Sequence, residues 1–144
     1  MKTIGRHLIA EFYGCDVEHL DDLAQVRLDM LAAAQIIGAT VRGDSFHRFS
    51  PQGVSGTVVI SESHLSIHTW PEYGYVAVDI FTCGGLDPRR GFEHLRRQLG
   101  AESCRVQEIL RGLPDHLASH GFPKAGDVTI VSQTASLGEM TPHT

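Results

Sequence analysis

Hydrophobic and polar residues alternate over several short stretches of the chain, which is the pattern of half-buried β-strands. At residues 6–12, Leu8, Ala10 and Phe12 fall on one face of such a strand, and Glu11 falls on the other. Further strands are predicted at residues 40–49, 54–69, 75–83 and 103–110, and glycine or proline residues separate most of them.

Apolar positions three or four residues apart predict two helices. Either Asp21 or Asp22 can cap the start of the first helix, and Gly38 stands just after its end. The second helix follows Asp87, with proline at its first position, and ends before Gly100. The two apolar stripes consist of Leu23, Val26, Met30 and Ile37, and of Phe92, Leu95 and Leu99.

This order of elements predicts an α+β fold, a two-layer sandwich in which helices cover one face of a mainly antiparallel sheet. The other face needs a different explanation. In the strand at 75–83, Val76, Val78 and Ile80 point one way, while Asp79 and Cys83 point the other way. The strand that begins at residue 54 has the same asymmetry, so the second face is mixed and suits a ligand site or a subunit interface.

Composition fits one ordinary globular domain. The chain has 144 residues, 42% hydrophobic and 20% charged, and lacks an apolar run of the roughly 18 residues that span a membrane. The N-terminus is too polar for a secretory signal, so we expect a cytoplasmic protein. Three cysteines without a C-x-x-C pair suggest reduced thiols. A net charge of −5 without a basic run argues against nucleic-acid binding and is compatible with a small cationic substrate.

Nine histidines raise the question of a metal site. His64 and His68 are four residues apart, but the β-branched and aromatic surroundings indicate an extended chain, which separates them by roughly 13 Å. Both cannot then bind one zinc ion at about 2 Å, and no metal is expected. The sequence GVSGT departs from the G-x-S-x-G motif of serine hydrolases at Thr57. Cys83, at a strand end, is a better reactive candidate than Cys15 or Cys104, although a strand cysteine is commonly a core residue.

The polar segment at residues 61–64 interrupts an apolar strand, and it suggests another use of serine. In a strained backbone, the Ser63 hydroxyl can attack the carbonyl of Glu62 and convert the amide into an ester. Elimination then breaks the ester, and hydrolysis leaves a pyruvoyl group, a ketone that forms Schiff bases. Ser55, His68 and Cys83 supply the side-chain types that such chemistry needs. A polar loop without chemistry is the alternative interpretation.

Three longer sequence motifs resemble those of a known protein family. The stretches GRHLIAEFYGCD, ISESHLSIHTWPE and DIFTCG closely resemble the prokaryotic S-adenosylmethionine decarboxylase proenzymes. The resemblance covers residues 1–111 and predicts a domain there. Residues 112–144 depart from the family pattern and are rich in Gly, Pro, Ser and Thr, so they predict an irregular C-terminal arm.

The resemblance implies an enzyme that cuts itself and uses the resulting pyruvoyl group to decarboxylate S-adenosylmethionine for spermidine and other polyamine synthesis. It implies a β chain of residues 1–62 and an α chain of residues 63–144. By this resemblance, Ser63 becomes the pyruvoyl group and Glu62 ends the β chain. During processing, His68 accepts a proton and Ser55 assists. In catalysis, Cys83 donates a proton, and Phe49, His68 and Glu72 bind the substrate.

The resemblance also implies a homodimer of αβ protomers with each site between the two, so the mixed sheet face is expected to meet a partner. Some relatives with the same processing motif decarboxylate arginine or ornithine instead, which is the alternative substrate class. In that case Asp115, Asp127 and Glu139 of the arm are candidates for binding a cationic side chain. Phe49 favours S-adenosylmethionine, since an aromatic ring suits a sulfonium group. An inactive partner subunit is the non-enzymatic alternative.

Overall fold

The structure is a computed structural model that describes residues 3–113. The expected arm therefore lies outside the described residues from position 114 onward, and so do Asp115, Asp127 and Glu139. The elements are β1 (Gly5–Tyr13), α1 (Val17–Leu20), α2 (Leu23–Ile36), β2 (Thr40–Arg48), β3 (Val54–Ser61), β4 (Ser63–Trp70), the 3₁₀ turn η1 (Pro71–Tyr73), β5 (Tyr75–Cys83), α3 (Pro88–Gln98) and β6 (Ser103–Arg111).

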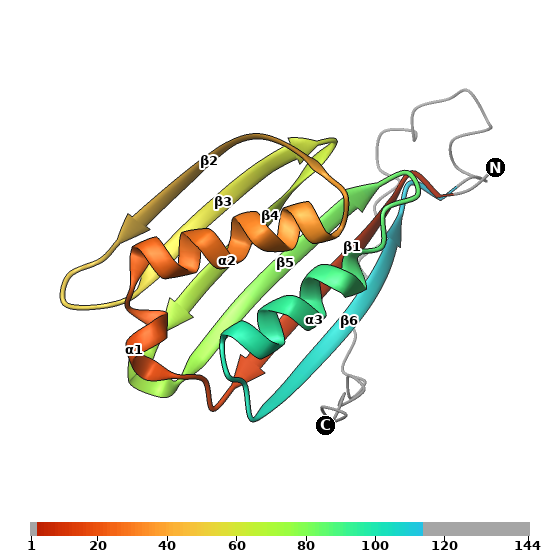
Figure 1. Cartoon of the computed structure of the whole chain (residues 1–144). Coiled ribbons are helices and arrows are strands. Elements are labelled where there is room, and N and C mark those ends of the chain that lie inside the picture. Colours follow the sequence, from red (N-terminus) through yellow and green to blue (C-terminus); the bar gives the residue numbers. More distant parts are fainter. Residues whose placement is uncertain (1–2, 114–144) are drawn as a thin grey trace, which may run out of the picture.

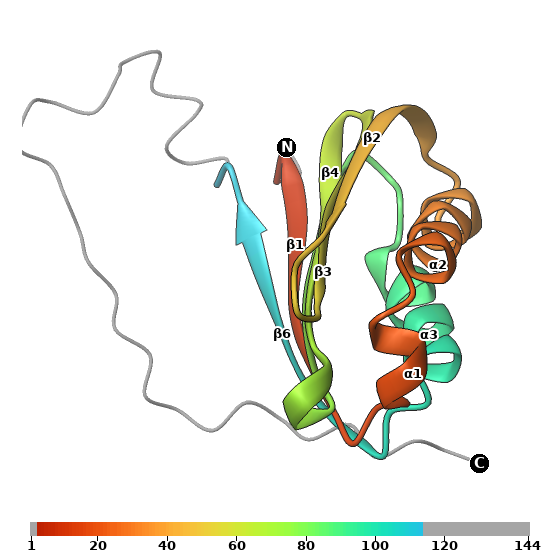
Figure 2. The same cartoon turned by 90° about the vertical axis from the view of Figure 1, so that its left-hand side faces the viewer.

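Six strands form one sheet in the order β2-β3-β4-β5-β1-β6, and every neighbouring pair is antiparallel (Figure 1). Helices α1, α2 and α3 all lie on one side of this sheet, as the edge-on view shows (Figure 2). No helix among residues 3–113 covers the opposite side, which we call the open face. The predicted mainly antiparallel sheet with helices on one face is confirmed.

The two long helices begin and end at the residues that the sequence indicated. Asp22 caps α2, because its carboxylate accepts a hydrogen bond from Gln25 N, and Asp87 caps α3 in the same way. After α2, Gly38 adopts φ +84°, a conformation that glycine tolerates better than other residues. These caps fix where each helix crosses the sheet.

The core fills the space between the helices and the sheet. Alternate residues of β5 are buried there, namely Val76, Val78 and Ile80, and they meet Phe92 and Leu95 of α3 in one hydrophobic cluster. Complete burial of a side chain of this size contributes about 1.5–3 kcal/mol. The alternation that the sequence predicted for β3 and β5 is confirmed, so the remaining residues of both strands face the open side.

The sequence predicted one strand over residues 54–69, and this was wrong. The segment is a hairpin in which Ile60 pairs with Ser63, so only Ser61 and Glu62 form the turn. Tight hairpins usually contain Gly or Asn, because their turns need positive φ angles. Neither residue is present here, and β-branched residues on both sides hid the reversal. The short helix α1 and the turn η1 were also not predicted, since neither is long enough to show a period.

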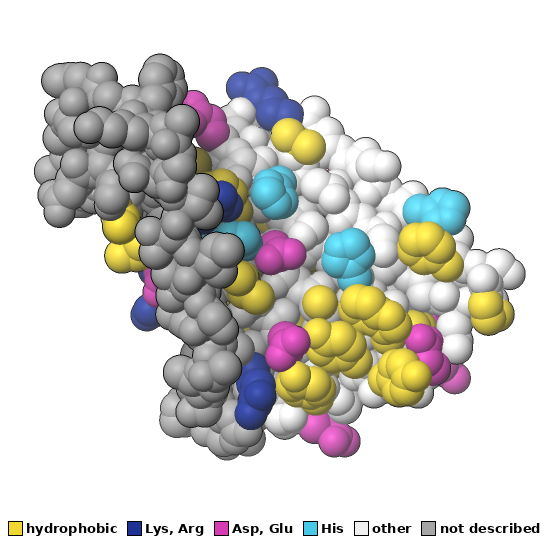
Figure 3. Space-filling view, turned by 180° about the vertical axis from the view of Figure 1, so that it is seen from behind, with side chains coloured by type: hydrophobic (Ala, Val, Ile, Leu, Met, Phe, Trp, Pro, Cys, Tyr) yellow, Lys and Arg dark blue, Asp and Glu magenta, His cyan; other side chains and the backbone are white. Residues whose placement is uncertain are grey.

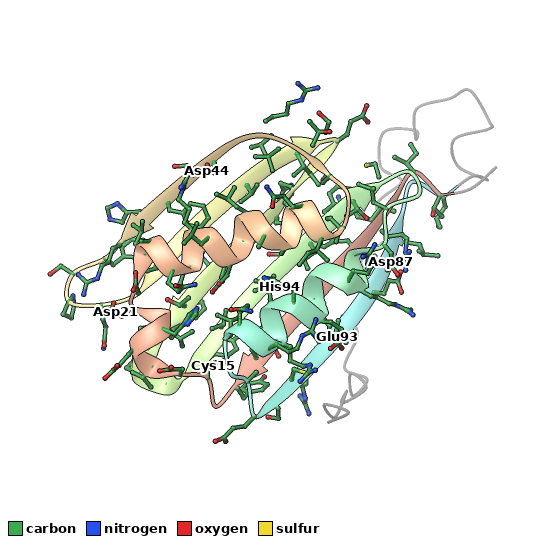
Figure 4. All side chains as sticks on the ribbon, viewed as in Figure 1. Cys15, Asp21, Asp44, Asp87, Glu93 and His94 are labelled. Atoms are coloured by element: carbon green, nitrogen blue, oxygen red, sulfur yellow. The ribbon has the colours of Figure 1, made fainter. Side chains whose placement is uncertain are left out.

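The loop between β2 and β3 is tied to the start of the helical layer. Asp21, which is labelled in Figure 4, accepts hydrogen bonds from Gly53 N at 2.9 Å and from Arg48 Nη2 at 2.6 Å. The backbone N–H of Gly53, followed by the guanidinium of Arg48, lowers the pKa of the Asp21 carboxyl group below its ordinary value. This clamp fixes the loop that carries Phe49.

Candidate active site

Ser63 occupies an exceptional backbone position at the turn between β3 and β4. Its φ angle is +116°, and it is the one residue other than glycine with a positive φ among the described residues. Such a conformation costs on the order of 1–3 kcal/mol in a residue with a Cβ atom. The strain lies directly after the peptide bond between Glu62 and Ser63, which is the bond that is expected to break.

Cys83 lies beside Ser63, because Ser63 pairs with Thr82 across β4 and β5. The Cys83 side chain is partly exposed, whereas Cys15 and Cys104 are buried. Burial raises the pKa of the Cys15 thiol to about 12, so this thiol stays protonated at neutral pH. Cys83 is therefore the accessible thiol among the described residues. We call Glu62, Ser63 and Cys83 the cleavage end of the sheet.

Ser55 and His68 form a hydrogen-bonded pair on β3 and β4. Their Cα atoms are partners in the strand register, and Ser55 Oγ lies 2.8 Å from His68 Nδ1. The tautomer of His68 decides which group donates this hydrogen bond. Either the Ser55 hydroxyl donates to the ring, or the ring N–H donates to the hydroxyl, and in both cases the bond orients the imidazole. The second ring nitrogen, Nε2, is then the group of His68 available for proton transfer.

Phe49 and Glu72 lie at the same end of the sheet as His68. Phe49 follows β2, is 46% exposed and contacts His47 edge to face. Glu72 is exposed on the turn η1, which follows directly after β4. We call Phe49, Ser55, His68 and Glu72 the histidine end. Hydrophobic side chains also gather toward one end of the open face, as the space-filling view shows (Figure 3).

The two ends are far apart within one chain. Ser63 and His68 both belong to β4 and are five residues apart, which in an extended strand is roughly 16 Å between their Cα atoms. The structure thus brings Ser63 together with Cys83, and Ser55 together with His68, but it does not bring these two pairs together. A proton cannot pass directly over such a distance, which exceeds hydrogen-bond reach several times.

Trp70 and Tyr13 belong to the aromatic side chains of the open face, and neither was identified from the sequence. The ring of Trp70 lies 6.3 Å from that of His68 and stacks on Tyr75 at 5.2 Å, and Tyr75 stacks on Tyr13. Glu11 accepts hydrogen bonds from both tyrosine hydroxyl groups, each at 2.8 Å. Burial, followed by the bond to Glu11, raises the pKa of both tyrosines. Strict alternation from His68 would have placed Trp70 on this face.

Other kinds of site find little support in residues 3–113. This part of the chain contains no cluster of three or more His, Cys, Asp or Glu side chains that suits a metal ion. His64 and His68 lie on one extended strand, as expected. None of the helices described here has the length and apolar character needed to cross a bilayer.

Comparisons with known proteins agree with these motifs. Residues 6–112 match the family model described as S-adenosylmethionine decarboxylase. The S-adenosylmethionine decarboxylase proenzyme of Thermotoga maritima is 56% identical over 125 residues, 86% of this chain and 94% of the relative. That of Fervidobacterium nodosum is 55% identical over 125 residues, with 86% and 89% covered.

Solved structures show the same relationship. The crystal structure of the adenosylmethionine decarboxylase from Aquifex aeolicus matches with a TM-score of 0.73 and 34% identity, covering 78% of this chain and 94% of that one. The Trypanosoma brucei AdoMetDC monomer shares the fold at a TM-score of 0.56 and 14% identity, with 81% and 51% covered. With a family match over most of its length and relatives more than half identical, this chain belongs to the S-adenosylmethionine decarboxylase family.

Proposed function

We propose that the chain is a self-processing, pyruvoyl-dependent decarboxylase that converts S-adenosylmethionine into its decarboxylated form, the aminopropyl donor of spermidine synthesis. Relatives with this activity in their names are 56% identical to it. The observation that carries the proposal is the position of Ser63, which is strained at φ +116° next to the accessible thiol of Cys83. Backbone strain of this kind is concentrated at active sites, and a serine hydroxyl is the nucleophile that pyruvoyl formation uses.

Self-cleavage follows from the groups at the turn. Ser63 Oγ attacks the carbonyl carbon of Glu62, the C–N bond breaks, and the hydroxyl proton passes to the amide nitrogen, which leaves an ester. A base then removes the α-proton of Ser63, the Cβ–O bond breaks, and Glu62 departs as a carboxylate. Water hydrolyses the remaining enamine to a ketone and releases ammonia. The positive φ of Ser63 lowers the barrier of the first step, because part of the distortion is present beforehand.

A second copy of the chain supplies the missing base in this proposal. Two open faces packed with a two-fold axis perpendicular to the strands would place the histidine end of one chain over the cleavage end of the other. His68 and Ser55 of the partner chain would then act on Ser63, and each dimer would contain two equal sites. The separation of roughly 16 Å within one chain supports this arrangement, and so does a large aromatic surface without a cover among the described residues.

In decarboxylation, the pyruvoyl group supplies a ketone that forms a Schiff base with the substrate amine and accepts electrons from its α-carbon. Cys83 holds a proton beside that position and delivers it to the α-carbon after carbon dioxide leaves. Phe49 offers an exposed ring for the adenine and the sulfonium group. Glu72 offers a carboxylate for the ribose hydroxyl groups.

The alternative substrates, arginine and ornithine, have no support from the relatives described above, which are named for S-adenosylmethionine. The cytoplasmic location expected from the sequence stays a prediction.

Intact mass under denaturing conditions tests the proposal. We expect fragments of residues 1–62 and 63–144, the second with a ketone at its N-terminus, which cyanoborohydride traps together with a substrate amine. Carbon dioxide release is then compared for S-adenosylmethionine, arginine, ornithine and lysine on one preparation. An uncut chain after long incubation contradicts self-processing, and turnover of arginine without S-adenosylmethionine contradicts the substrate.

A further inference from the structure

A β-bulge in β2 gives Arg42 an unusual position. The register with β3 steps from Val41 directly to Gly43, so Arg42 has no Cα partner on that strand. A bulge residue directs its side chain differently from a residue in a regular strand. The bulge lies close to the turn between β3 and β4, because Thr40 pairs with Ser61. Arg42 is therefore directed at the segment in which the chain is proposed to break.

The Arg42 side chain contacts this turn directly. Its Nε donates a hydrogen bond of 2.5 Å to Ser61 Oγ. Ser61 is the last residue of β3, and only Glu62 separates it from Ser63. A guanidinium group has five N–H donors, so four more are available on the same plane. Among residues 3–113, no ion pair includes Arg42.

The strand that presents Arg42 is firmly attached to the helical layer. On one side of the bulge, Asp44 binds Arg27 of α2 through two hydrogen bonds of 2.8 and 3.0 Å. Toward the far end of β2, Arg48 binds Asp21. Bidentate pairs of this kind restrict orientation as well as distance. Arg42 therefore lies on a strand that is held in place, and it contacts the turn whose peptide bond is proposed to break.

We propose that Arg42 is a positioning residue for self-cleavage: it holds Ser61 ahead of the bond that breaks, and it then pairs with the carboxylate that forms at Glu62. This inference rests on the proposed function. As the α-proton leaves Ser63, its electrons form the Cα–Cβ double bond, and the Cβ–O bond breaks with both electrons going to the oxygen. Glu62, which is exposed, then carries two negative charges, one on its side chain and one at the new terminus.

A cation one residue away stabilises that developing charge, since the remaining N–H groups of Arg42 suit a carboxylate in geometry and sign. The same contact keeps the end of the β chain in place after cleavage. Arg42 does not touch the reacting atoms of Ser63 in this account, and its effect belongs to cleavage rather than to decarboxylation.

The experiment follows cleavage in time, using cell-free synthesis of the full chain with a short radioactive pulse. We expect Arg42→Ala to lengthen the half-time of cleavage about three- to tenfold, the range for one charged hydrogen bond at an exposed site. Arg42→Lys should recover part of the rate, and Arg42→Gln should not. Arg97→Ala, which removes the same charge from an exposed position on α3, is the matched control and should cleave at the wild-type rate.

Two further measurements separate positioning from other roles. In a Ser61→Ala background, Arg42→Ala should have a smaller effect than in the wild type, because part of its action passes through Ser61. Once fully cleaved, the Arg42→Ala enzyme should decarboxylate with wild-type kcat and KM. Equal half-times for wild type, Arg42→Ala and Arg97→Ala would overturn the inference, and so would full recovery by Arg42→Gln. An uncut wild-type chain would instead refute the proposed function, so the two failures are distinguishable.

Discussion

The cleavage end and the histidine end of the sheet each lack what the other one has. At the cleavage end, Ser63 has the strain and the neighbouring thiol that its chemistry needs, but within its own chain His68 lies roughly 16 Å away. At the histidine end, Ser55 and His68 form a complete hydrogen-bonded pair, but the bond that should break is far from it. Each end holds half of the expected machinery.

The difference between the two ends suggests how a small domain can form an active site from residues that are far apart in one chain. One face of the sheet serves the hydrophobic core and is closed by α2 and α3, whereas the other face is free to carry two unlike half-sites at its two ends. The proposed two-fold dimer would bring the two half-sites together twice, because in a self-complementary interface each contact occurs in both directions. The dimer is thus part of the proposed catalytic design.

The largest expected effect is at the cleavage end. Ser63→Ala removes the attacking hydroxyl group, so the chain should stay intact and lack a pyruvoyl group, with no detectable decarboxylation. The Ser55–His68 hydrogen bond should remain, since it lies at the other end. Denaturing mass spectrometry measures the first result. A cut Ser63→Ala chain would show that another residue supplies the nucleophile.

Cys83→Ala tests the second group of the same end. The chain should still cleave, but decarboxylation should fall about a hundredfold or more, because protonation of the α-carbon loses its donor. The control is Cys104→Ala, which removes a buried thiol on the helical side and should keep turnover per folded molecule. Full activity of Cys83→Ala would assign this residue to packing alone.

A smaller effect is expected at the histidine end. Glu72→Gln should leave cleavage unchanged and raise KM for S-adenosylmethionine about tenfold, which corresponds to one charged hydrogen bond. Glu18→Gln on α1 is the matched control, since Glu18 is also exposed but lies in the helical layer. Equal KM values for the two variants would remove Glu72 from the substrate site.

The smallest effect concerns the clamp that supports Phe49. The pKa of Asp21 is lowered by Gly53 N and Arg48, so this carboxylate stabilises the fold above the pKa of an unfolded aspartate, about 3.9, and the contribution is lost as pH falls through the lower folded value. Asp21→Asn should therefore reduce Tm slightly at pH 7. Below about pH 4, the Tm of this variant should fall less with decreasing pH than the Tm of the wild type. An unchanged acid profile would show that the clamp does not contribute.

Much of the fold could be predicted from periodicity. The alternation at Val76, Val78 and Ile80 gave the buried face of β5, and Asp87 with its following proline gave the start of α3. The hairpin at Glu62 could not be predicted, because it lacks the turn residues that normally signal one. Motif resemblance identified Ser63, His68 and Cys83, and the spacing of an extended strand already implies that Ser63 and His68 lie far apart. The sequence could not reveal the strand register, which pairs His68 with Ser55 and places Ser63 opposite Thr82.

Complementation between two inactive variants tests the shared site most directly. Alone, a tagged His68→Ala chain and a Ser63→Ala chain should each stay uncut. When both are co-expressed at equal levels and form mixed dimers, Ser63 of the first chain meets His68 of the second, so about half of the His68→Ala chains should cleave. The mixed dimers should carry one working site and decarboxylate S-adenosylmethionine. Mixed dimers that purify together while every His68→Ala chain remains intact would contradict a site built from both chains.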